Sequence, residues 1–258
     1  MDKATPLSTP MENRSLNVER DPFRPCEDSG KILGPEVPYM SDIGGLLYLA
    51  NCTRSDIAFA TNLLARYSSA PTRRYLSDPH KAQSQTGYVF TIDGTAIFWR
   101  SQKQTLVATS SNYAETIALH EACRECVWFR SMSQHIQEAS GLVFKKERTK
   151  VFEDNSACVA QLKEGYIKSD RTKHIPPRFF SYIWELEKNK EVDIEYVRSC
   201  DNPADLFTKA LPATTLRKHV YGIGMRRLQN TMSIILRGRL RYNTLFPSSW
   251  FLYYWVFP

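Results

Sequence analysis

The sequence predicts an α/β fold of the α+β kind, in which helices flank a mixed sheet. Residues 87–101 show the two-residue alternation of strands on either side of an Asp93-Gly94 turn. Residues 111–136 repeat apolar side chains at helical spacing, and residues 149–211 alternate strand-like with helix-like segments. Strands interleaved with helices need helical cover on their faces, so we expect a mixed sheet with helices packed against it.

Composition shifts divide the chain into four predicted segments. Residues 1–38 are rich in proline and lack a sustained period, which predicts an extended segment, and residues 39–74 are predicted to be helical. Thr53 followed by Asp56 resembles a capping box, so two helices joined by a short turn are expected there. Residues 75–212 hold the predicted sheet domain. Residues 213–258 form a basic and aromatic tail that we expect to be poorly ordered.

A hairpin and a long helix are predicted first in the sheet domain. Strands at 87–92 and 95–101 flank the Asp93-Gly94 turn, and TLVATS at 105–110 predicts a third short strand. Ser110 or Ser111 is expected to cap a long helix, with Gly141 beyond its end. Its apolar face comprises Ala114, Ile117, Ala118, Ala122, Cys126, Phe129, Met132 and Ile136.

The rest of this domain repeats the alternation. The last helix is expected to begin at Asn202 and Pro203, a capping residue followed by a proline suited to a first helical position. The predicted elements are a strand at 149–154, helices at 156–164 and 175–189, a strand at 192–199 and a helix at 203–211.

The net charge of +7 belongs to the C-terminal part of the chain. From Leu206 onward there are eight Lys or Arg residues and no Asp or Glu, which leaves −1 for residues 1–205. Net charge is therefore no argument that the body of the protein binds nucleic acid, although a local basic stripe could.

The six cysteines and the absence of a signal peptide predict reduced thiols in the cytoplasm or nucleus. Cys123 and Cys126 lie within a helical pattern without a second pair at zinc spacing, so we expect them to pack in the core. The apolar run in the tail is interrupted by Pro247 and too short to span a bilayer, so no membrane contact is expected.

Three acidic residues at predicted element ends could converge. Glu115 lies in the first turn of the predicted long helix, Asp154 at the end of a strand, and Asp205 in the first turn of the last helix. Singly, each has a structural explanation, because acidic residues complement helix N-termini or cap them. Together, clustered carboxylates are the ligands that two divalent ions need in phosphodiester hydrolysis.

The local sequences around these residues identify a family. KQTLVATSSNYAETIALHEACRECVW, VFEDNSACVAQL, DRTKHI and SCDNPADLFTKAL resemble the ribonuclease H domain of copia-type long-terminal-repeat retrotransposons, in a form similar to plant elements. The preceding VPYMSDIGGLLYLANCTRSDIAFATNLLARYSSAPT resembles the C-terminal part of the same polyprotein's reverse transcriptase. The resemblance extends over about residues 4–228, with four motifs in the family's order.

This resemblance implies roles for particular residues. Glu115, Asp154 and Asp205 match three of the family's four carboxylates that bind Mg²⁺ in a ribonuclease H of RNA–DNA hybrids. The resemblance also implies that six further residues lie near the hybrid, namely Lys103, Gln104, Ser110, Ser111, Asn155 and His174. The implied partners are an RNA–DNA hybrid or other nucleic acid and other Pol-derived proteins, with no small-molecule cofactor. For His174, a structural role at a helix start remains an alternative.

The chain departs from the family between Arg74 and Tyr75. The family has a central first strand before the YLSDPHK loop, and that strand carries the first catalytic aspartate, whereas RYSSAPTRR here continues directly into YLSDPHK. We therefore expect a ribonuclease H-like sheet that lacks its central first strand and leaves the two neighbouring strands unpaired. Because the first catalytic aspartate is lost with that strand, we also expect that the protein does not cleave hybrids.

Two other interpretations stay open. The chain could be a non-catalytic module that binds nucleic acid, or it could fail to fold cooperatively. Polymerase activity is not expected, because the sequence contains no Tyr-x-Asp-Asp and no other pair of adjacent aspartates.

Overall fold

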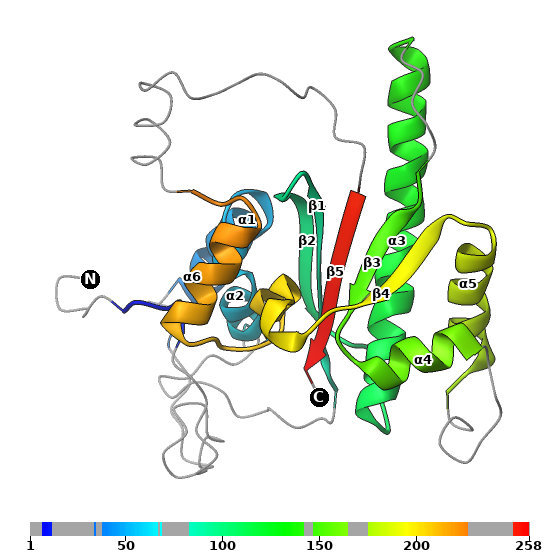
Figure 1. The fold of residues 1–258 in the computed structure, drawn as a ribbon. Helices are drawn as coiled ribbons and strands as arrows, with labels where there is room; N and C mark the ends of the chain where they lie inside the picture. Colours follow the sequence, from blue (N-terminus) through cyan, green and yellow to red (C-terminus); the bar gives the residue numbers. More distant parts are fainter. Residues whose placement is uncertain are drawn as a thin grey trace.

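The structure, a computed structural model, describes residues 7–11, 34, 38–66, 68, 83–141, 147–164 and 175–226, and the backbone of residues 250–257 (Figure 1). The α-helices are α1 (Tyr39–Cys52), α2 (Ala58–Ala65), α3 (Ser111–Ala139), α4 (Ser156–Glu164), α5 (Pro177–Lys188) and α6 (Ala213–Gly222). The strands are β1 (Gln85–Ile92), β2 (Thr95–Lys103), β3 (Thr149–Glu153), β4 (Val192–Tyr196) and β5 (Trp250–Phe257). Short 3₁₀ helices are η1 (Ser55–Ile57), η2 (Ser199–Asp201) and η3 (Pro203–Phe207).

The five strands form one mixed sheet in the order β2-β1-β5-β3-β4. β1 pairs antiparallel with β2 and β5, whereas β3 pairs parallel with β4 and β5. The expectation of an α/β protein with a mixed sheet and flanking helices is therefore confirmed.

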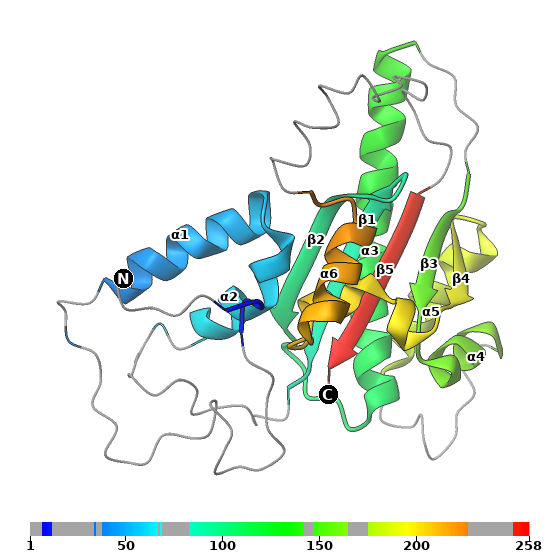
Figure 2. The same cartoon turned by 60° about the vertical axis from the view of Figure 1, so that its left-hand side comes forward.

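The middle position of this sheet is occupied by the C-terminal strand β5 (Figures 1 and 2). Its pairing with β1 covers the whole strand, from Gln85↔Phe257 to Ile92↔Trp250. On the other side it pairs with β3, where Phe152 lies opposite Tyr253. The expectation that two strands would be left without a partner is wrong, because a segment from the tail supplies their hydrogen bonds.

Helices cover both faces of the sheet and bury a separate apolar cluster on each. On one face, α3, α4 and α5 pack against β1, β3 and β4, around side chains such as Tyr88, Leu119 and Ile183. On the other, α1, α2, η3 and α6 surround Val89, with Phe207 and Ile223 fully or almost fully buried. The backbone of β5 lies between the two layers, beside α3 on one side and η3 on the other.

The long helix α3 begins and ends as its sequence predicts. The Ser110 hydroxyl accepts a hydrogen bond from the Tyr113 amide at 3.1 Å, and Gly141 beyond the C-terminus has a φ of +65°. The predicted apolar face is buried only as far as Phe129, and Met132 and Ile136 are exposed. Figure 1 shows the C-terminal end of α3 extending past the sheet.

The hairpin turn is also confirmed, because Asp93 and Gly94 have φ values of 52° and 70°. Two nearby local predictions are wrong. Residues 105–110 form no strand, and the chain passes directly from β2 through a loop to α3. The Thr53 hydroxyl donates to the Leu49 carbonyl at 3.5 Å instead of capping the next helix.

The predicted helix at 203–211 is shorter than expected. Asn202 accepts a hydrogen bond from the Ala204 amide at 3.1 Å, as a capping residue should, but the helix is the five-residue 3₁₀ segment η3. The α6 helix begins only after Pro212, and with β5 it gives two regular elements to the segment expected to be disordered.

Among the described residues no helix is long and apolar enough to cross a membrane. The predicted extended segment lies mostly outside the described residues, as do the loop at 75–82 and the basic run at 227–249.

Candidate metal centre

Three elements bring acidic side chains to one end of the sheet. Asp154 directly follows the last residue of β3, and Glu115 lies one turn inside α3, slightly later than its predicted place. Asp205 lies in the first turn of η3. The β5 backbone adjoins all three of these elements.

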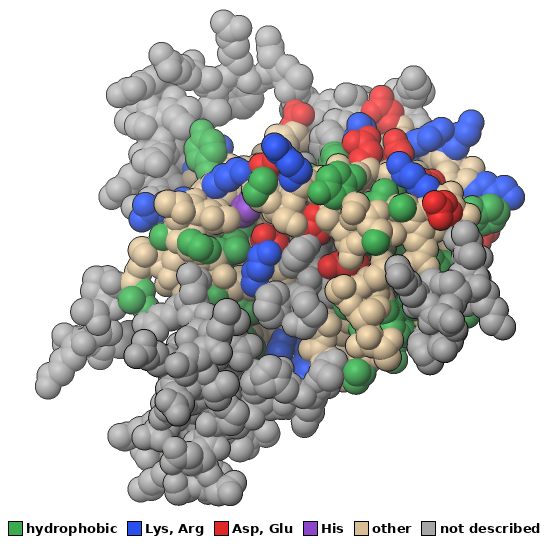
Figure 3. All heavy atoms as spheres, turned by 60° about the horizontal axis from the view of Figure 1, so that its bottom comes forward, with side chains coloured by type: hydrophobic (Ala, Val, Ile, Leu, Met, Phe, Trp, Pro, Cys, Tyr) green, Lys and Arg blue, Asp and Glu red, His purple; other side chains and the backbone are tan. Residues whose placement is uncertain are grey.

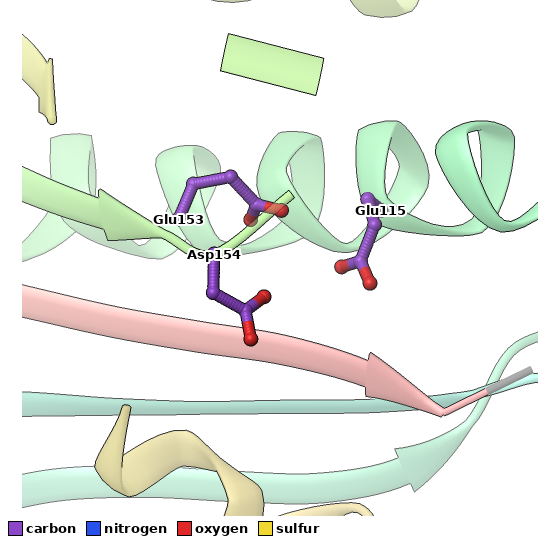
Figure 4. Close-up of side chains that lie close together, drawn as sticks. All are labelled: Glu115, Glu153 and Asp154. Carbon is purple, nitrogen blue, oxygen red and sulfur yellow. The ribbon is translucent and has the colours of Figure 1, made fainter. Parts of the chain in front are cut away.

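The closest group consists of Glu115, Glu153 and Asp154 (Figure 4). Each offers a carboxylate oxygen, and these oxygens all lie within 4.8 Å of one another. The three side chains are 4%, 0% and 8% exposed, so water screens their mutual repulsion poorly.

Asp154 is partly satisfied by its neighbours. Its Oδ2 atom accepts a hydrogen bond from the Ser199 hydroxyl at 2.5 Å, whereas Oδ1 is buried without a hydrogen-bond partner. Burial raises the pKa of Asp154 to about 6, the Ser199 hydrogen bond opposes this rise, and the negative charge of Asp205 adds to it. A buried carboxylate with an unpartnered oxygen is costly unless a proton or a cation compensates it.

Asp205 lies near this group but outside it. Its Oδ2 atom forms an ion pair with Lys209 Nζ at 2.9 Å, and the carboxylate is 4% exposed. Burial raises the pKa of Asp205 and the charge of Lys209 lowers it. Of the three predicted carboxylates, Glu115 and Asp154 thus lie together, whereas Asp205 forms an ion pair with Lys209.

Glu153 is the member of the group that sequence reasoning missed. Its Oε1 atom accepts a hydrogen bond from the Asn155 amide at 2.8 Å. The alternation of β3 contained the signal, because Thr149, Val151 and Glu153 share a face and all three are buried.

Several residues predicted to lie near nucleic acid form local hydrogen bonds within the protein. Gln104 is buried and donates to Thr86 Oγ1 at 3.1 Å and to the Ala114 carbonyl at 2.9 Å. Ser110 caps α3, and the Asn155 side chain accepts from the amides of Ala157 and Cys158 at the start of α4.

Two other predicted contacts are accessible. Lys103 at the end of β2 is half-buried, and Ser111 at the start of α3 is exposed. The predicted contact at His174 lies outside the described residues.

The two cysteines of the C-x-x-C pattern lie in the core, as predicted. Cys123 and Cys126 are buried within α3, and burial raises the pKa of both thiols. Neither belongs to the metal-ligand group found among the described residues.

The donor set of this centre fits a hard divalent cation. Mg²⁺, Mn²⁺ and Ca²⁺ prefer carboxylate oxygens, and Asp154 Oδ1 is buried and has no hydrogen-bond partner. Fold and site together define an α/β protein with a helix-covered mixed sheet and a buried carboxylate centre at one end of it.

Comparison with known proteins identifies its family. The chain is 30% identical to the retrovirus-related Pol polyprotein from transposon TNT 1-94 of Nicotiana tabacum. The match extends over 248 residues and covers 82% of this chain. The chain is also 24% identical over 266 residues to the corresponding polyprotein from transposon RE1 of Arabidopsis thaliana, over 88% of this chain. The chain belongs to the retrovirus-related Pol polyproteins of plant transposons, which confirms the predicted relationship to a plant retrotransposon Pol polyprotein.

The matches also define how much of such a polyprotein is represented. The chain spans 18% of the tobacco protein and 17% of the Arabidopsis protein. A third relative, secreted RxLR effector protein 161 of Plasmopara viticola, is 32% identical over 129 residues, which is 36% of this chain and 91% of that protein. No family model and no solved structure matches the chain.

Proposed function

We propose that the chain is a Pol-derived fragment with a ribonuclease H-like domain that does not hydrolyse RNA–DNA hybrids. Glu115, Asp154 and Asp205 correspond to three of the four carboxylates implied by the resemblance. Their placement near one end of a mixed sheet supports this correspondence. Residues 39–74 would then be the remnant of a reverse transcriptase.

The proposal that activity is lost rests on β5, the strand at the centre of the sheet. β5 pairs antiparallel with β1 and parallel with β3, so it occupies the central position that the resemblance assigns to the missing first strand, and it adjoins α3 and η3. Its sequence, WFLYYWVF, contains no Asp or Glu. The pairing of the missing strand is therefore replaced, but its carboxylate is not.

Bound Mg²⁺ would supply an activated water and a positive charge near the scissile phosphate. In this chain Glu115 and Asp154 would hold the cation by their carboxylate oxygens. Asp205 would be a weaker ligand because Lys209 already neutralises it at 2.9 Å. Without a fourth carboxylate, a pair of ions has too few protein ligands, and hydrolysis is not expected.

A cleavage assay tests this proposal. Full-length protein is incubated with a labelled RNA–DNA hybrid and Mg²⁺ beside two variants, Glu115→Gln and Glu138→Gln. Glu138 lies on the same helix and is exposed, so its variant controls for an unspecific effect of the substitution, whereas cleavage that persists in Glu115→Gln would come from a contaminating nuclease. No cleavage above the buffer blank is expected. Cleavage that persists in Glu138→Gln and disappears in Glu115→Gln would overturn the proposal.

A second candidate function is binding of nucleic acid without cleavage. It is favoured by the eight Lys or Arg residues from Leu206 onward, a stretch without acidic residues. The described ones are partly engaged, since Lys209 pairs with Asp205 and Lys218 with Asp201 at 2.7 Å. Figure 3 shows basic and acidic side chains intermixed on one face of the protein.

Binding of a hybrid at 50 mM and 200 mM salt, measured by fluorescence anisotropy, separates the two candidates. Electrostatic binding should weaken steeply with salt and depend little on sequence. No binding at low salt would remove the second candidate.

A further inference from the structure

We propose that Glu115, Glu153 and Asp154 bind one divalent cation, with Glu153 as a ligand that the resemblance to the family does not assign. The inference rests on the proposed function, in which the same end of the sheet is a carboxylate centre. The inferred site differs from the site implied by the resemblance in its set of ligands and in the number of ions that it binds.

The spacing of the oxygens suits a single ion. Two oxygens on opposite sides of one cation are separated by two metal–oxygen bonds, which is about 4.2 Å for Mg²⁺ and about 4.8 Å for Ca²⁺. The ligand oxygens of the three residues lie within 4.8 Å of one another. One ion can therefore contact all three side chains with little or no movement of the backbone.

The unpartnered oxygen of Asp154 points to a ligand. Asp154 Oδ1 is buried and has no hydrogen-bond partner, while Oδ2 is fixed by Ser199. Figure 4 shows the three side chains close together at the end of β3, with Glu115 reaching from α3 toward the other two and the Asp154 carboxylate on the side of β5. A cation there would satisfy this oxygen and remove the repulsion among three buried acidic groups.

Glu153 is held in place for this role. Its Oε1 atom is fixed by the Asn155 amide at 2.8 Å, and Asn155 is itself fixed by its hydrogen bonds to the start of α4. The carboxylate therefore sits at the end of a rigid strand, with 0% of the residue exposed. Preorganised ligands of this kind lose little side-chain entropy when an ion binds.

Lys209 explains why Glu153, and not Asp205, is the third ligand. An ion bound by Asp205 would have to compete with the Lys209 ammonium group, which already lies 2.9 Å from the carboxylate. Glu153, unlike Asp205, belongs to the group of oxygens that lie close together.

Titration with Mn²⁺ tests the ligand set without reference to activity. Bound and free Mn²⁺ are measured by electron paramagnetic resonance for the full-length protein and for Glu153→Gln, Asp205→Asn and Glu164→Gln. Glu164 is exposed at the end of α4 and serves as the matched control. We expect one bound ion, an affinity at least about tenfold lower in Glu153→Gln, and unchanged affinity in Glu164→Gln.

Three results would overturn the inference. They are no binding by the wild-type protein at millimolar Mn²⁺, equal affinity in Glu153→Gln, or a larger loss in Asp205→Asn than in Glu153→Gln. Thermal melts without metal establish that each variant folds. If Glu153→Gln does not fold, it is replaced by Glu153→Asp, which keeps the charge and withdraws the carboxylate by one methylene group. An affinity of that variant equal to that of the wild-type protein likewise contradicts the inference.

The result can be separated from that of the cleavage assay. Hydrolysis of a hybrid would overturn the proposed loss of activity whatever the Mn²⁺ titration shows. Absence of a Glu153 effect would overturn the present inference while leaving the proposed function intact.

Discussion

The indole nitrogen of Trp99 donates a hydrogen bond of 2.7 Å to the carbonyl of Ala50. Trp99 lies in β2 and Ala50 near the end of α1, so this contact joins the N-terminal helices to an edge strand of the sheet. Ala50 and the neighbouring Ala58 are buried in the same apolar cluster, against which Trp99 packs. The N-terminal helices and the sheet thus belong to the same packed body.

Replacing Trp99 with Phe tests the energetic value of this contact. The variant keeps an aromatic ring but leaves the Ala50 carbonyl without its donor, so the free energy of unfolding should fall by about 1 kcal/mol or more. Urea denaturation measures this loss. The control is Trp128→Phe, because Trp128 is 56% exposed and should change stability by less than about 0.5 kcal/mol. Equal effects of the two variants would show that the hydrogen bond contributes nothing specific.

Gly87 provides a prediction about close packing. A Cβ atom at this position would lie 2.6 Å from both Phe207 Cβ and Thr208 Cγ2, so Gly87→Ala should destabilise the protein by about 1–3 kcal/mol. Thermal or urea unfolding measures the change.

The matched control is Gly44→Ala in α1, where a Cβ atom would meet nothing within 4 Å. Alanine is favoured over glycine in a helix by about 1 kcal/mol, so this variant should be more stable than the wild type. The two substitutions are chemically identical, and effects of the same sign would contradict the packing around β1.

Tyr253 tests whether β5 holds the sheet together. This residue pairs with Val89 on one side and Phe152 on the other. Proline there cannot donate a backbone hydrogen bond and belongs at sheet edges, so Tyr253→Pro should cost about 3 kcal/mol or more. Tyr253→Val keeps the amide and a residue suited to strands, and it should cost much less. Hydrogen exchange of the β1 and β3 amides measures the result, and unchanged protection in the proline variant would refute this strand pairing.

His219 predicts a pH dependence of stability. The side chain is 3% exposed, Nε2 has no hydrogen-bond partner, and burial lowers its pKa to about 4. Lys218 and Lys209 lower the pKa further and Asp201 opposes them. Between about pH 6.5 and pH 4 the unfolded chain binds a proton that the folded protein does not, so acidification over this range should reduce stability by up to roughly 3 kcal/mol.

The comparison variant for this effect is His219→Gln, which does not titrate. The difference in unfolding free energy between wild type and variant should therefore change with pH between 6.5 and 4. A difference that stays constant over this range would rule out His219 as the cause.

Local sequence signals predicted the local structure well. The Ser110 cap, the Asp93-Gly94 turn and Gly141 each depend on a few neighbouring residues, and each is found in the structure. The prediction of a strand at 105–110 failed because β-branched residues favour a strand only where a partner is available. No described strand pairs with that segment.

Non-local features could not be predicted in the same way. Asp154 and Glu115 were expected to converge because both lie at element ends, and they do. Glu153 was overlooked because its neighbour Asp154 carries the family motif. The Asp205–Lys209 ion pair depends on the turn geometry of a 3₁₀ segment that had been predicted as a longer helix. The position of β5 depends on pairing with strands far away in the sequence, which periodicity does not reveal.

The origin of β5 sets an order of events during synthesis of the chain. Residues 85–196, which contain the other four strands, leave the ribosome well before residues 250–257. Until then β1 and β3 lack the strand that joins them, so the two halves of the sheet can form only as separate units. Such long-range closure makes folding slow and leaves exposed strand edges on the nascent chain, where chaperones or a second copy can bind. The last strand made is the one that joins the two halves of the sheet.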